Sequence, residues 1–446
     1  MHSFASLPAV ILGSLAVGAG LVASEEFAQP YISEYQAYND GLFGVHPNQT
    51  YKTTETLGLL FQVNQWHPEK SGLSRYLFMS SLAGDQGATP FIIDTKDLSM
   101  VYGDPKWEST NNPRIQMFNG VPYFTFWAGR DYRGHGLGHC LLYDSSYQQV
   151  YNISTKMINT LADSHECQLT DDGTALITAY ERIPFDMSNA PGGGPENGLL
   201  LDSIFEEIDI ATGELKFLWR ASKHFDLNET EVFWGGNDYG APTEEVGWDS
   251  FHINSLQKTR EGNYLVSGRR IKSLFTDLSG GSATNFGFQH TARFLDDDLT
   301  EITLFDNHDL NPSNPSPGCI EGCSRGLHLR INTTAMTAEV VHEYYHPINI
   351  ASWAMGGIQK LDNGNVLVSW GTTPAITEYT EDGEIVLDAM LGPWDDELNN
   401  RQPVYRAWTM DWTAYPPWNP SIAGDEKFAY VSWNGATEVD SWDIVS

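Results

Sequence analysis

The sequence predicts an all-β fold, a β-propeller with six blades, on three observations. Short apolar or alternating runs recur along the chain, separated by Gly, Asp, Asn and Pro, which is typical of strands joined by tight turns. Long stretches with the 3.6-residue period of helices do not occur. The chain has 446 residues and no linker that divides it. One domain of this length requires a closed array of repeated sheets.

The predicted strands are spread over most of the chain. They are 76–79, 91–93, 123–127, 175–178, 264–267, 366–370 and 428–433. Three of them follow similar turns, at 171–174, 261–263 and 362–365, whose residues tolerate positive φ and indicate a hairpin that leads into a buried strand. Such self-similarity is typical of propeller blades. Aromatic residues make up 12% of the chain, which suits packing between blades.

The N-terminus predicts a secretory signal. Residues 9–22 are apolar or small, and residues 21–24 offer small side chains for cleavage. A membrane anchor is the alternative, but the run is shorter than the roughly 20 residues that span a bilayer. We therefore expect removal of residues 1–24, one propeller domain over 25–446, and a protein that is secreted or resides in the secretory pathway.

Four glycosylation sequons agree with secretion. Their asparagines are Asn48, Asn152, Asn228 and Asn332.

The four cysteines predict two disulfides in an oxidising compartment. Cys319 and Cys323 would close a small loop, and Cys140 and Cys167 would join two neighbouring strands. A zinc site is the alternative, but the sequence has no paired C-x-x-C units.

The formal net charge of −33 excludes some partners. It results from 58 acidic and 25 basic residues, none of them within residues 1–24. Such a charge argues against nucleic acid and, after removal of the signal, against an anionic membrane surface. Any anion site must then be a local positive pocket in a negative protein.

Four polar side chains on two short motifs carry the candidate chemistry. Residues 251–255 (Phe-His-Ile-Asn-Ser) contain His252 and Asn254, and a predicted strand leads from there to Arg269. Residues 288–293 (Phe-Gln-His-Thr-Ala-Arg) contain His290. Two imidazoles, a carboxamide and a guanidinium can bind a sulfate-like anion and supply a nitrogen nucleophile. In a propeller, inner strands of different blades face one funnel, so these groups can meet.

Structural roles are the alternative for each group. His252 and Asn254 alternate along a strand, so both are expected on one face, where a buried His–Asn pair is common. Arg269 alone would suit a structural ion pair, and His290 alone a blade edge. The joint pattern favours a shared pocket.

Other histidines are less informative. His328 alternates with apolar neighbours and is a further candidate for the pocket. His135 and His139 flank a glycine-rich stretch, for which we expect neither phosphate nor metal binding, because no helix pattern follows.

Many segments follow the order of one known family. They are 123–129, 164–178, 202–214, 219–222, 226–230, 251–255, 288–293, 324–332, 363–371 and 430–439. On these segments the chain resembles the arylsulfotransferase-like family, in particular its fungal secreted branch. The resemblance covers nearly all of the predicted mature chain.

The resemblance implies a six-bladed propeller and transfer of a sulfuryl group from an aryl sulfate to a phenol through a sulfo-histidine. It implies no cofactor, no metal and no nucleotide donor, and a small aromatic or phenolic substrate. By motif, His290 would be the nucleophile and His252 a second catalytic group. The substrate would be held by Asn254, Arg269, His165, Thr372 and His328, of which His328 comes from the strand pattern alone.

Two departures from the family pattern favour other activities. The segment 270–288 is shorter than in family members, and Arg270 stands where fungal members tend to carry histidine. One alternative is a propeller enzyme that cyclises or isomerises a secondary metabolite without sulfuryl transfer. Another is a secreted propeller that binds a ligand without turnover.

Overall fold

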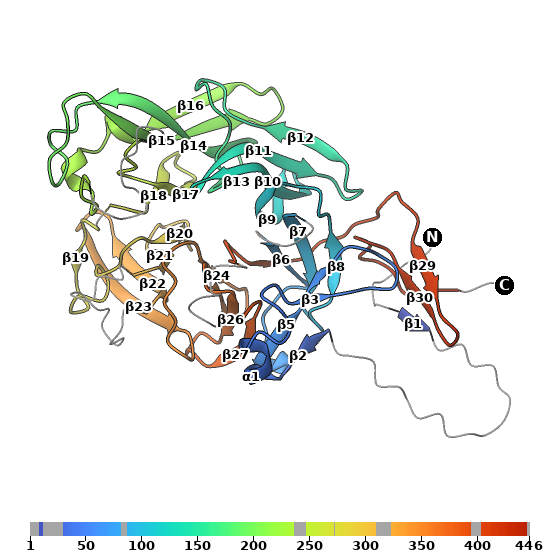
Figure 1. The fold of residues 1–446 in the computed structure, drawn as a ribbon. Coiled ribbons are helices and arrows are strands. Elements are labelled where there is room, and N and C mark those ends of the chain that lie inside the picture. Colours follow the sequence, from blue (N-terminus) through green and yellow to red (C-terminus); the bar gives the residue numbers. More distant parts are fainter. Residues whose placement is uncertain are drawn as a thin grey trace.

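The protein is an all-β propeller, as the sequence predicts. The computed structural model describes residues 9–11, 30–81, 87–235, 247–271, 273–308, 323–393 and 403–443. Five sheets of four or more strands form a ring around a common centre (Figure 1). Each sheet is antiparallel for most of its width, and successive strands are joined by short hairpins.

The strands of the five sheets follow the chain around the ring. The first sheet contains β28 (Trp408–Met410), β6 (Tyr76–Ser81), β7 (Thr89–Asp94) and β8 (Met100–Gly103). The second contains β9 (Ser109–Phe118), β10 (Val121–Tyr132), β11 (His135–Tyr143) and β12 (Gln149–Ile153). The third contains β13 (Cys167–Leu169), β14 (Thr174–Phe185), β15 (Gly198–Asp209) and β16 (Leu215–Arg220).

The last two sheets each include a strand from elsewhere. The fourth contains β20 (His290–Phe294), β21 (Glu301–Asp306), β22 (Arg325–Asn332), β23 (Thr337–Tyr345) and β19 (Thr276–Asp277). The fifth contains β24 (Gly357–Lys360), β25 (Val366–Ser369), β26 (Ala375–Tyr379), β27 (Ile385–Met390), β5 (Phe61–Trp66) and β2 (Tyr31–Ile32).

The blade count is five, so the prediction of six blades is wrong. Between the third and fourth sheets lies a two-stranded hairpin, β17 (Ile253–Lys258) with β18 (Tyr264–Gly268). The short segment that follows builds no outer strands for this hairpin within the described residues. It supplies β19 instead, which pairs in parallel with β23 of the fourth sheet. Because segment 270–288 is short, the hairpin is not completed to a full blade, and the ring has five blades instead of six.

The ring is closed by strands from both ends of the chain. β5 pairs with β27, whose residues lie more than 300 positions later in the sequence. β28 pairs with β6 and forms the innermost strand of the first sheet. Short apolar runs give no indication of such distant partners.

The predicted turns join the first two strands of their hairpins, as expected. Their glycines have φ of +76° at Gly173, +84° at Gly262 and +92° at Gly364. These values lie in the left-handed region that favours glycine. All seven predicted strands are observed, but the one at 428–433 lies outside the ring as β30 (Ala429–Ser432). There it pairs with β29 (Ser421–Gly424) and β1 (Ala9–Ile11).

Buried apolar side chains fill the spaces between neighbouring sheets. One such cluster joins Tyr76 and Phe78 of the first sheet to Phe124 and Phe126 of the second. The high aromatic content therefore packs blade against blade. The remaining elements are short: β3 (Asn48–Gln49), β4 (Gly58–Leu59), α1 (Tyr35–Asn39), η1 (Pro68–Lys70), η2 (Ala221–Lys223) and η3 (Leu227–Glu229).

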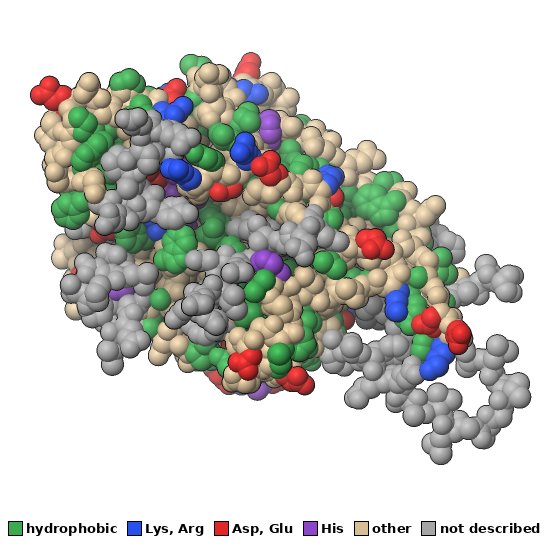
Figure 2. All heavy atoms as spheres, viewed as in Figure 1, with side chains coloured by type: hydrophobic (Ala, Val, Ile, Leu, Met, Phe, Trp, Pro, Cys, Tyr) green, Lys and Arg blue, Asp and Glu red, His purple; other side chains and the backbone are tan. Residues whose placement is uncertain are grey.

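The features expected of a secreted protein are only partly described. The asparagines of all four sequons are exposed. Acidic side chains are scattered over the visible face (Figure 2). Most of the predicted signal segment, 1–8 and 12–24, lies outside the described residues, so its cleavage stays a prediction. None of the described helices has the length and apolar character needed to cross a membrane.

One predicted disulfide is confirmed. Cys140 on β11 is bonded to Cys167 at the start of β13, with their Cα atoms 6.0 Å apart. The bond joins the second sheet to the third at a buried position. Cys319 lies outside the described residues, so the pairing of Cys319 with Cys323 stays a prediction.

Replacing both Cys140 and Cys167 by Ala should lower the free energy of unfolding by about 3 kcal/mol, because the bond closes a loop in the unfolded chain. The two residues are 27 positions apart. Urea denaturation of the variant and of the wild-type protein measures the difference. An unchanged denaturation midpoint would show that the bond contributes no stability.

Candidate active site

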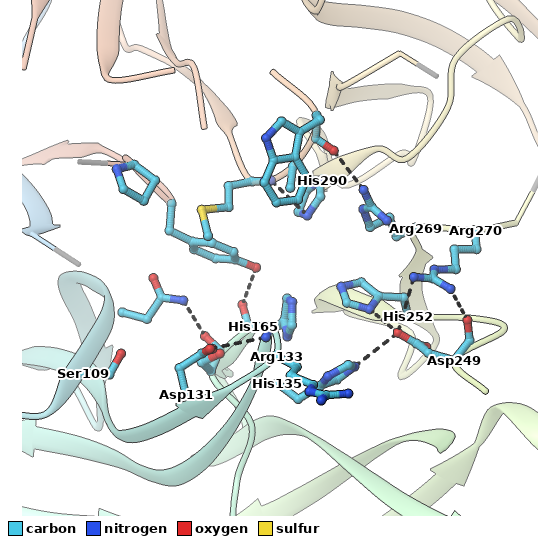
Figure 3. A pocket seen from close by; sticks show the side chains of 18 residues that line it. Ser109, Asp131, Arg133, His135, His165, Asp249, His252, Arg269, Arg270 and His290 are labelled. Carbon is cyan, nitrogen blue, oxygen red and sulfur yellow. Dashed lines mark hydrogen bonds and ion pairs between the residues drawn. The ribbon is translucent and has the colours of Figure 1, made fainter. Parts of the chain in front are cut away.

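A cavity of about 280 Å³ lies where the innermost strands begin (Figure 3). His165 stands two residues before β13, His252 directly before β17, and His290 is the first residue of β20. Each innermost strand starts at the same end of the ring, so residues far apart in sequence converge there. Other lining residues are Ser109, His135, Asp249, Arg270, Met355 and Tyr405.

Four of the predicted site residues line this cavity: His165, His252, Arg269 and His290. The ring centroids of His165 and His252 are 4.8 Å apart. All four residues are at least nine-tenths buried. The spatial convergence that the motifs predict is therefore present, although the shortened blade lies next to it.

The orientation of His290 is fixed by Asn307. The amide nitrogen of Asn307 donates to the carbonyl oxygens of Ser352 and Met355, at 2.8 and 2.9 Å. Its oxygen therefore faces His290 Nδ1, 2.6 Å away, and must accept a hydrogen bond there. Nδ1 then carries the proton. Nε2 is left with its lone pair and accepts one long bond, 3.3 Å, from the N–H of Met355.

His290 is neutral at ordinary pH. Burial holds the pKa of His290 well below 6.5, and the nearby charge of Arg269 lowers it further. The amide of Asn307 favours protonation, but it carries no charge with which to stabilise an imidazolium. The result is a neutral imidazole in a buried, polar cavity, whose Nε2 is engaged only by the long bond from Met355.

The guanidinium of Arg269 is held in place on two sides. It donates to the carbonyl oxygen of Trp353 at 2.8 Å. It also lies over the ring of Phe288, 4.4 Å from the centroid. Arg269 follows β18 directly, and therefore reaches the cavity from the same open end of the hairpin as His252, whose carbonyl oxygen accepts the Arg269 N–H at 2.9 Å.

His165 forms a pair with a buried carboxylate. Its Nδ1 lies 2.6 Å from Asp163 Oδ2. Burial alone would raise the pKa of Asp163, but the charge and hydrogen bond of His165 lower it to about 2. The other carboxylate oxygen accepts the N–H of Gly136 at 2.6 Å. A Cβ at position 136 would lie 2.4 Å from the nitrogen of Ser164, so the glycine-rich stretch allows this close approach.

A second buried carboxylate, that of Asp249, contacts two histidines. Asp249 Oδ2 lies 2.5 Å from His252 Nδ1 and 3.1 Å from His135 Nε2. Arg270 Nη2 is 3.9 Å from the same oxygen. Burial lowers the pKa of His252 to about 3 despite Asp249. The pKa of His135 is raised, because its hydrogen bond to Asp249 and the carboxylate charge outweigh burial.

A buried ionic cluster of Glu166 with Arg114, Arg293 and Arg406 adjoins the cavity lining. Arg114 and Arg406 approach the carboxylate at 2.9 and 3.1 Å, and Arg293 contacts it as well. Glu166 follows His165 in sequence, and Arg406 follows Tyr405. Three guanidinium groups against one carboxylate place excess positive charge next to the cavity. The charges of the arginines offset burial and lower the pKa of Glu166 to about 2.

The backbone around the cavity is strained at several non-glycine residues. Positive φ occurs at His252 (56°), Phe288 (53°), Thr291 (55°) and Met355 (66°). Such conformations cost about 1–3 kcal/mol each and gather at functional sites. Here they mark the points where inner strands begin and turn their first side chains into the cavity.

Asn254 does not line the cavity, against the prediction that it shares a face with His252. The positive φ of His252 and a register shift between Ile253 and Ser255 break the alternation on which that prediction relied. The amide of Asn254 donates instead to the carbonyl oxygen of Gln289 at 2.6 Å and ties the hairpin to β20.

Thr372 and His328 also lie outside the cavity lining. Thr372 bonds through its hydroxyl to Ser352 at 3.0 Å and thereby supports the segment that carries Met355. His328 lies on β22, two strands outward from β20, and its Nε2 meets Glu301 at 3.0 Å.

The sequence analysis does not predict four functional groups. His135 and Asp249 line the cavity, and Asp163 and Asn307 hold cavity histidines. The sequence does contain a signal for the two carboxylates, because each stands two or three residues before a predicted pocket histidine, in Asp163-x-His165 and Asp249-x-x-His252. Asn307 offered none, because its partner is 17 residues away on the neighbouring strand.

The fold and the cavity together define a class of protein, the β-propellers with a polar, histidine-rich site at the start of their innermost strands. Residues 114–392, more than half of the chain, match the Arylsulfotransferase (ASST) family. The chain therefore belongs to this family and is an arylsulfotransferase-like propeller. No curated protein sequence matches it significantly.

Solved structures show only distant similarity. A protein of unknown function from Bacteroides caccae is 13% identical, with a TM-score of 0.39 over 75% of this chain and 98% of that one. The periplasmic gluconolactonase PpgL of Pseudomonas aeruginosa is 12% identical, with a TM-score of 0.38 over 71% of this chain and 96% of that one. At TM-scores this low, the similarities say nothing about the reaction of this protein.

Proposed function

We propose that the protein moves a sulfuryl group from an aryl sulfate to a phenol, with His290 as the nucleophile. The observation that carries this proposal is the state of His290. Its Nδ1 is committed to Asn307, and its Nε2 keeps a lone pair beside the guanidinium of Arg269. A neutral imidazole is a competent nucleophile, and a guanidinium is suited to the oxygens of a sulfuryl group.

The hydrogen-bond partners of the three cavity histidines give these histidines different proposed roles. An uncharged amide holds Nδ1 of His290, whereas the carboxylate of Asp163 holds Nδ1 of His165. His165 is therefore the group proposed to move the proton. His252 is buried and neutral. Its Nδ1 donates to Asp249, which leaves Nε2 as a hydrogen-bond acceptor toward the cavity.

The reaction proceeds in two balanced steps. In the first, Nε2 of His290 forms a bond to sulfur, the bond from sulfur to the phenol oxygen breaks, and protonated His165 gives its proton to the departing phenolate. In the second, the acceptor phenol returns a proton to His165, its oxygen attacks sulfur, and the nitrogen–sulfur bond breaks. Arg269 stabilises the charge on the sulfuryl oxygens in both steps.

The charge distribution supports an anionic substrate in a negative protein. The ionic cluster around Glu166 places excess positive charge next to the cavity, and Arg269 and Arg270 add to it at the wall. An aryl sulfate carries one negative charge and a flat apolar ring. The ring of Tyr405, 6.3 Å from that of His290, offers a surface for it.

The test is direct. Mixing the purified protein with 4-nitrophenyl sulfate should release 4-nitrophenolate, and the quenched protein should carry one sulfuryl group on the peptide with His290, detected by mass spectrometry. A phenol added afterwards should remove the group and appear as its sulfate ester. If no aryl sulfate in a broad panel gives release or labelling, the proposal fails.

Arg269→Lys should lower kcat by about 10²–10³-fold, because lysine keeps the charge but loses the planar fork of donors. Steady-state kinetics with 4-nitrophenyl sulfate measures the effect. Arg260→Lys is the matched control, since Arg260 is 72% exposed and pairs with Asp297 at the surface. An Arg269→Lys enzyme with unchanged kcat would remove Arg269 from the reaction.

A second candidate function is the cyclisation or isomerisation of a secondary metabolite. It is favoured by the absence of Asn254 from the described cavity lining and by the reduced hairpin beside it. The two His–Asp pairs would serve as acid and base. Conversion of a metabolite in the absence of any sulfate donor would distinguish it from sulfuryl transfer.

We further propose that the protein is secreted and glycosylated, as in the fungal branch that it resembles. The disulfide between Cys140 and Cys167 and the exposed sequon asparagines support this proposal.

A further inference from the structure

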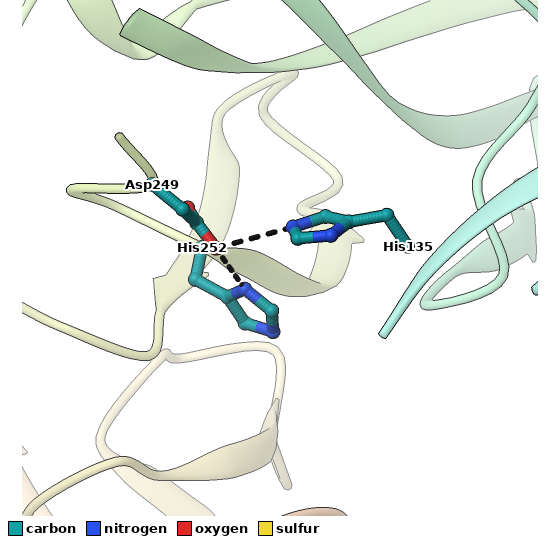
Figure 4. Close-up of side chains that lie close together, drawn as sticks. All are labelled: His135, Asp249 and His252. Atoms are coloured by element: carbon teal, nitrogen blue, oxygen red, sulfur yellow. Dashed lines mark hydrogen bonds and ion pairs between the residues drawn. The ribbon is translucent and has the colours of Figure 1, made fainter. Parts of the chain in front are cut away.

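We propose that His135, Asp249 and His252 bind a divalent metal ion at one wall of the cavity (Figure 4). One ligand atom from each residue lies within 4.8 Å of the other two. His135 begins β11, whereas Asp249 and His252 lie in the segment that leads into β17. The site would therefore bridge the second sheet and the reduced hairpin, which do not follow each other in the ring.

The spacing of the three groups fits a metal centre. Ligands bound to zinc at about 2.0–2.2 Å in a tetrahedron lie about 3.3 Å from one another. Asp249 Oδ2 is 2.5 Å from His252 Nδ1 and 3.1 Å from His135 Nε2. Both separations are somewhat shorter than that value, and the ligand atoms of the remaining pair lie within 4.8 Å of each other. Binding one ion would therefore require the two imidazoles to move slightly away from Asp249 Oδ2.

The two carboxylate oxygens of Asp249 differ in their hydrogen-bond partners. Its Oδ2 faces two imidazoles and Arg270, whereas its Oδ1 is buried and lacks a hydrogen-bond partner among the described residues. The side chain is only 3% exposed. A buried carboxylate oxygen without a partner is costly and requires an explanation. A cation bound by both oxygens of Asp249 would supply one.

The ligand set selects the type of metal. Two imidazole nitrogens and one carboxylate oxygen suit zinc, cobalt and other transition ions, whereas magnesium and calcium prefer sets made of oxygen. Arg270, 3.9 Å from the same carboxylate, fixes Asp249 through its carbonyl oxygen but also repels a cation. We therefore expect a reversible site with a moderate affinity.

A metal here would change what the cavity offers to a ligand. Three protein ligands leave at least one coordination position, and all three residues line the cavity. That position would take an anionic oxygen, such as a phenolate or a carboxylate. Metal on Nδ1 of His252 would also move its proton to Nε2, so the imidazole would present a donor to the cavity. The inference does not depend on sulfuryl transfer, since it concerns binding alone.

Cobalt is the probe for the test. The full-length protein is freed of metal by a chelator and titrated with Co²⁺, whose visible absorption reports coordination by nitrogen and oxygen. We expect bands that saturate at one equivalent, disappear on addition of Zn²⁺, and accompany a rise in the melting temperature. His135→Ala and Asp249→Asn should each weaken binding by at least about 10-fold.

Two variants serve as controls. His139→Ala removes another imidazole of β11 that lies outside the trio, and His165→Ala removes a cavity imidazole that is not a proposed ligand. Both should bind Co²⁺ as the wild-type protein does. Circular dichroism checks that each variant is folded. If Asp249→Asn does not fold, His135→Ala still decides the question. Absence of cobalt bands in the wild-type protein, or unchanged binding by His135→Ala, would overturn the proposal.

Discussion

His290→Ala should lower phenolate release from 4-nitrophenyl sulfate by at least about 10⁴-fold, because the variant lacks the proposed nucleophile. The other two histidines at the starts of inner strands, His165 and His252, direct Nδ1 to carboxylates and not to an amide. The variant should also show no sulfuryl label on the protein. Initial rates and intact mass after a quench measure both effects.

The control for this variant is His67→Ala. His67 has an imidazole that is 41% exposed, and it does not line the cavity. Its removal should leave the rate and the label unchanged. A His290→Ala protein that is folded and still releases phenolate at the wild-type rate would contradict the nucleophilic role.

Glu166→Gln should lower the free energy of unfolding by about 3–5 kcal/mol, because it leaves three buried arginines without their carboxylate. The side chains of Glu166 and Arg406 are fully buried, and that of Arg114 is 5% exposed. A glutamine keeps the shape but cannot balance the charge. Urea denaturation followed by tryptophan fluorescence measures the loss.

The same residue should make the protein sensitive to acid. The pKa of Glu166 is about 2 in the folded protein, below its ordinary 4.5, because the arginine charges outweigh the opposing effect of burial. The ionised carboxylate of Glu166 therefore makes its full contribution to the free energy of unfolding above about pH 4.5. That contribution is lost as the pH falls toward 2. This part of the acid-induced loss of stability should be missing in Glu166→Gln.

A surface pair provides the matched control for this substitution. Glu339 lies 2.7 Å from Arg330, but the side chains are 41% and 54% exposed. Glu339→Gln should cost no more than about 1 kcal/mol, because water already solvates both charges. An equal loss in the two variants would mean that the buried cluster contributes no more than a surface pair.

Much of the fold could be predicted from local sequence. The runs at 175–178 and 264–267 and the turns before them are strands and hairpins in the structure, because alternation and turn chemistry act within a few residues. The number of blades could not be predicted. It depends on whether the segment 270–288 pairs with its own hairpin or with β23, and that choice is made by partners distant in sequence.

The residues of the candidate site likewise include some that local sequence predicts and others that it does not. His252 and His290 could be found because the polar residue stands at the start of a strand. The side-chain partners that fix their tautomers could not be assigned, since Asn307 acts from the adjacent strand and Asp249 also binds His135 from another sheet. Asn254 was misplaced because a single residue with positive φ reversed the expected face.

The sequence by itself determined that the chain is a β-propeller of this family and that His165, His252, His290 and Arg269 share one cavity, since strand patterns and motifs are local properties. Only the tertiary structure decided which nitrogen of each imidazole holds a proton, which carboxylates are shared, and where the excess positive charge lies. Those properties arise from contacts between blades, and hydrogen bonds and charges depend on distances in space that sequence spacing does not specify.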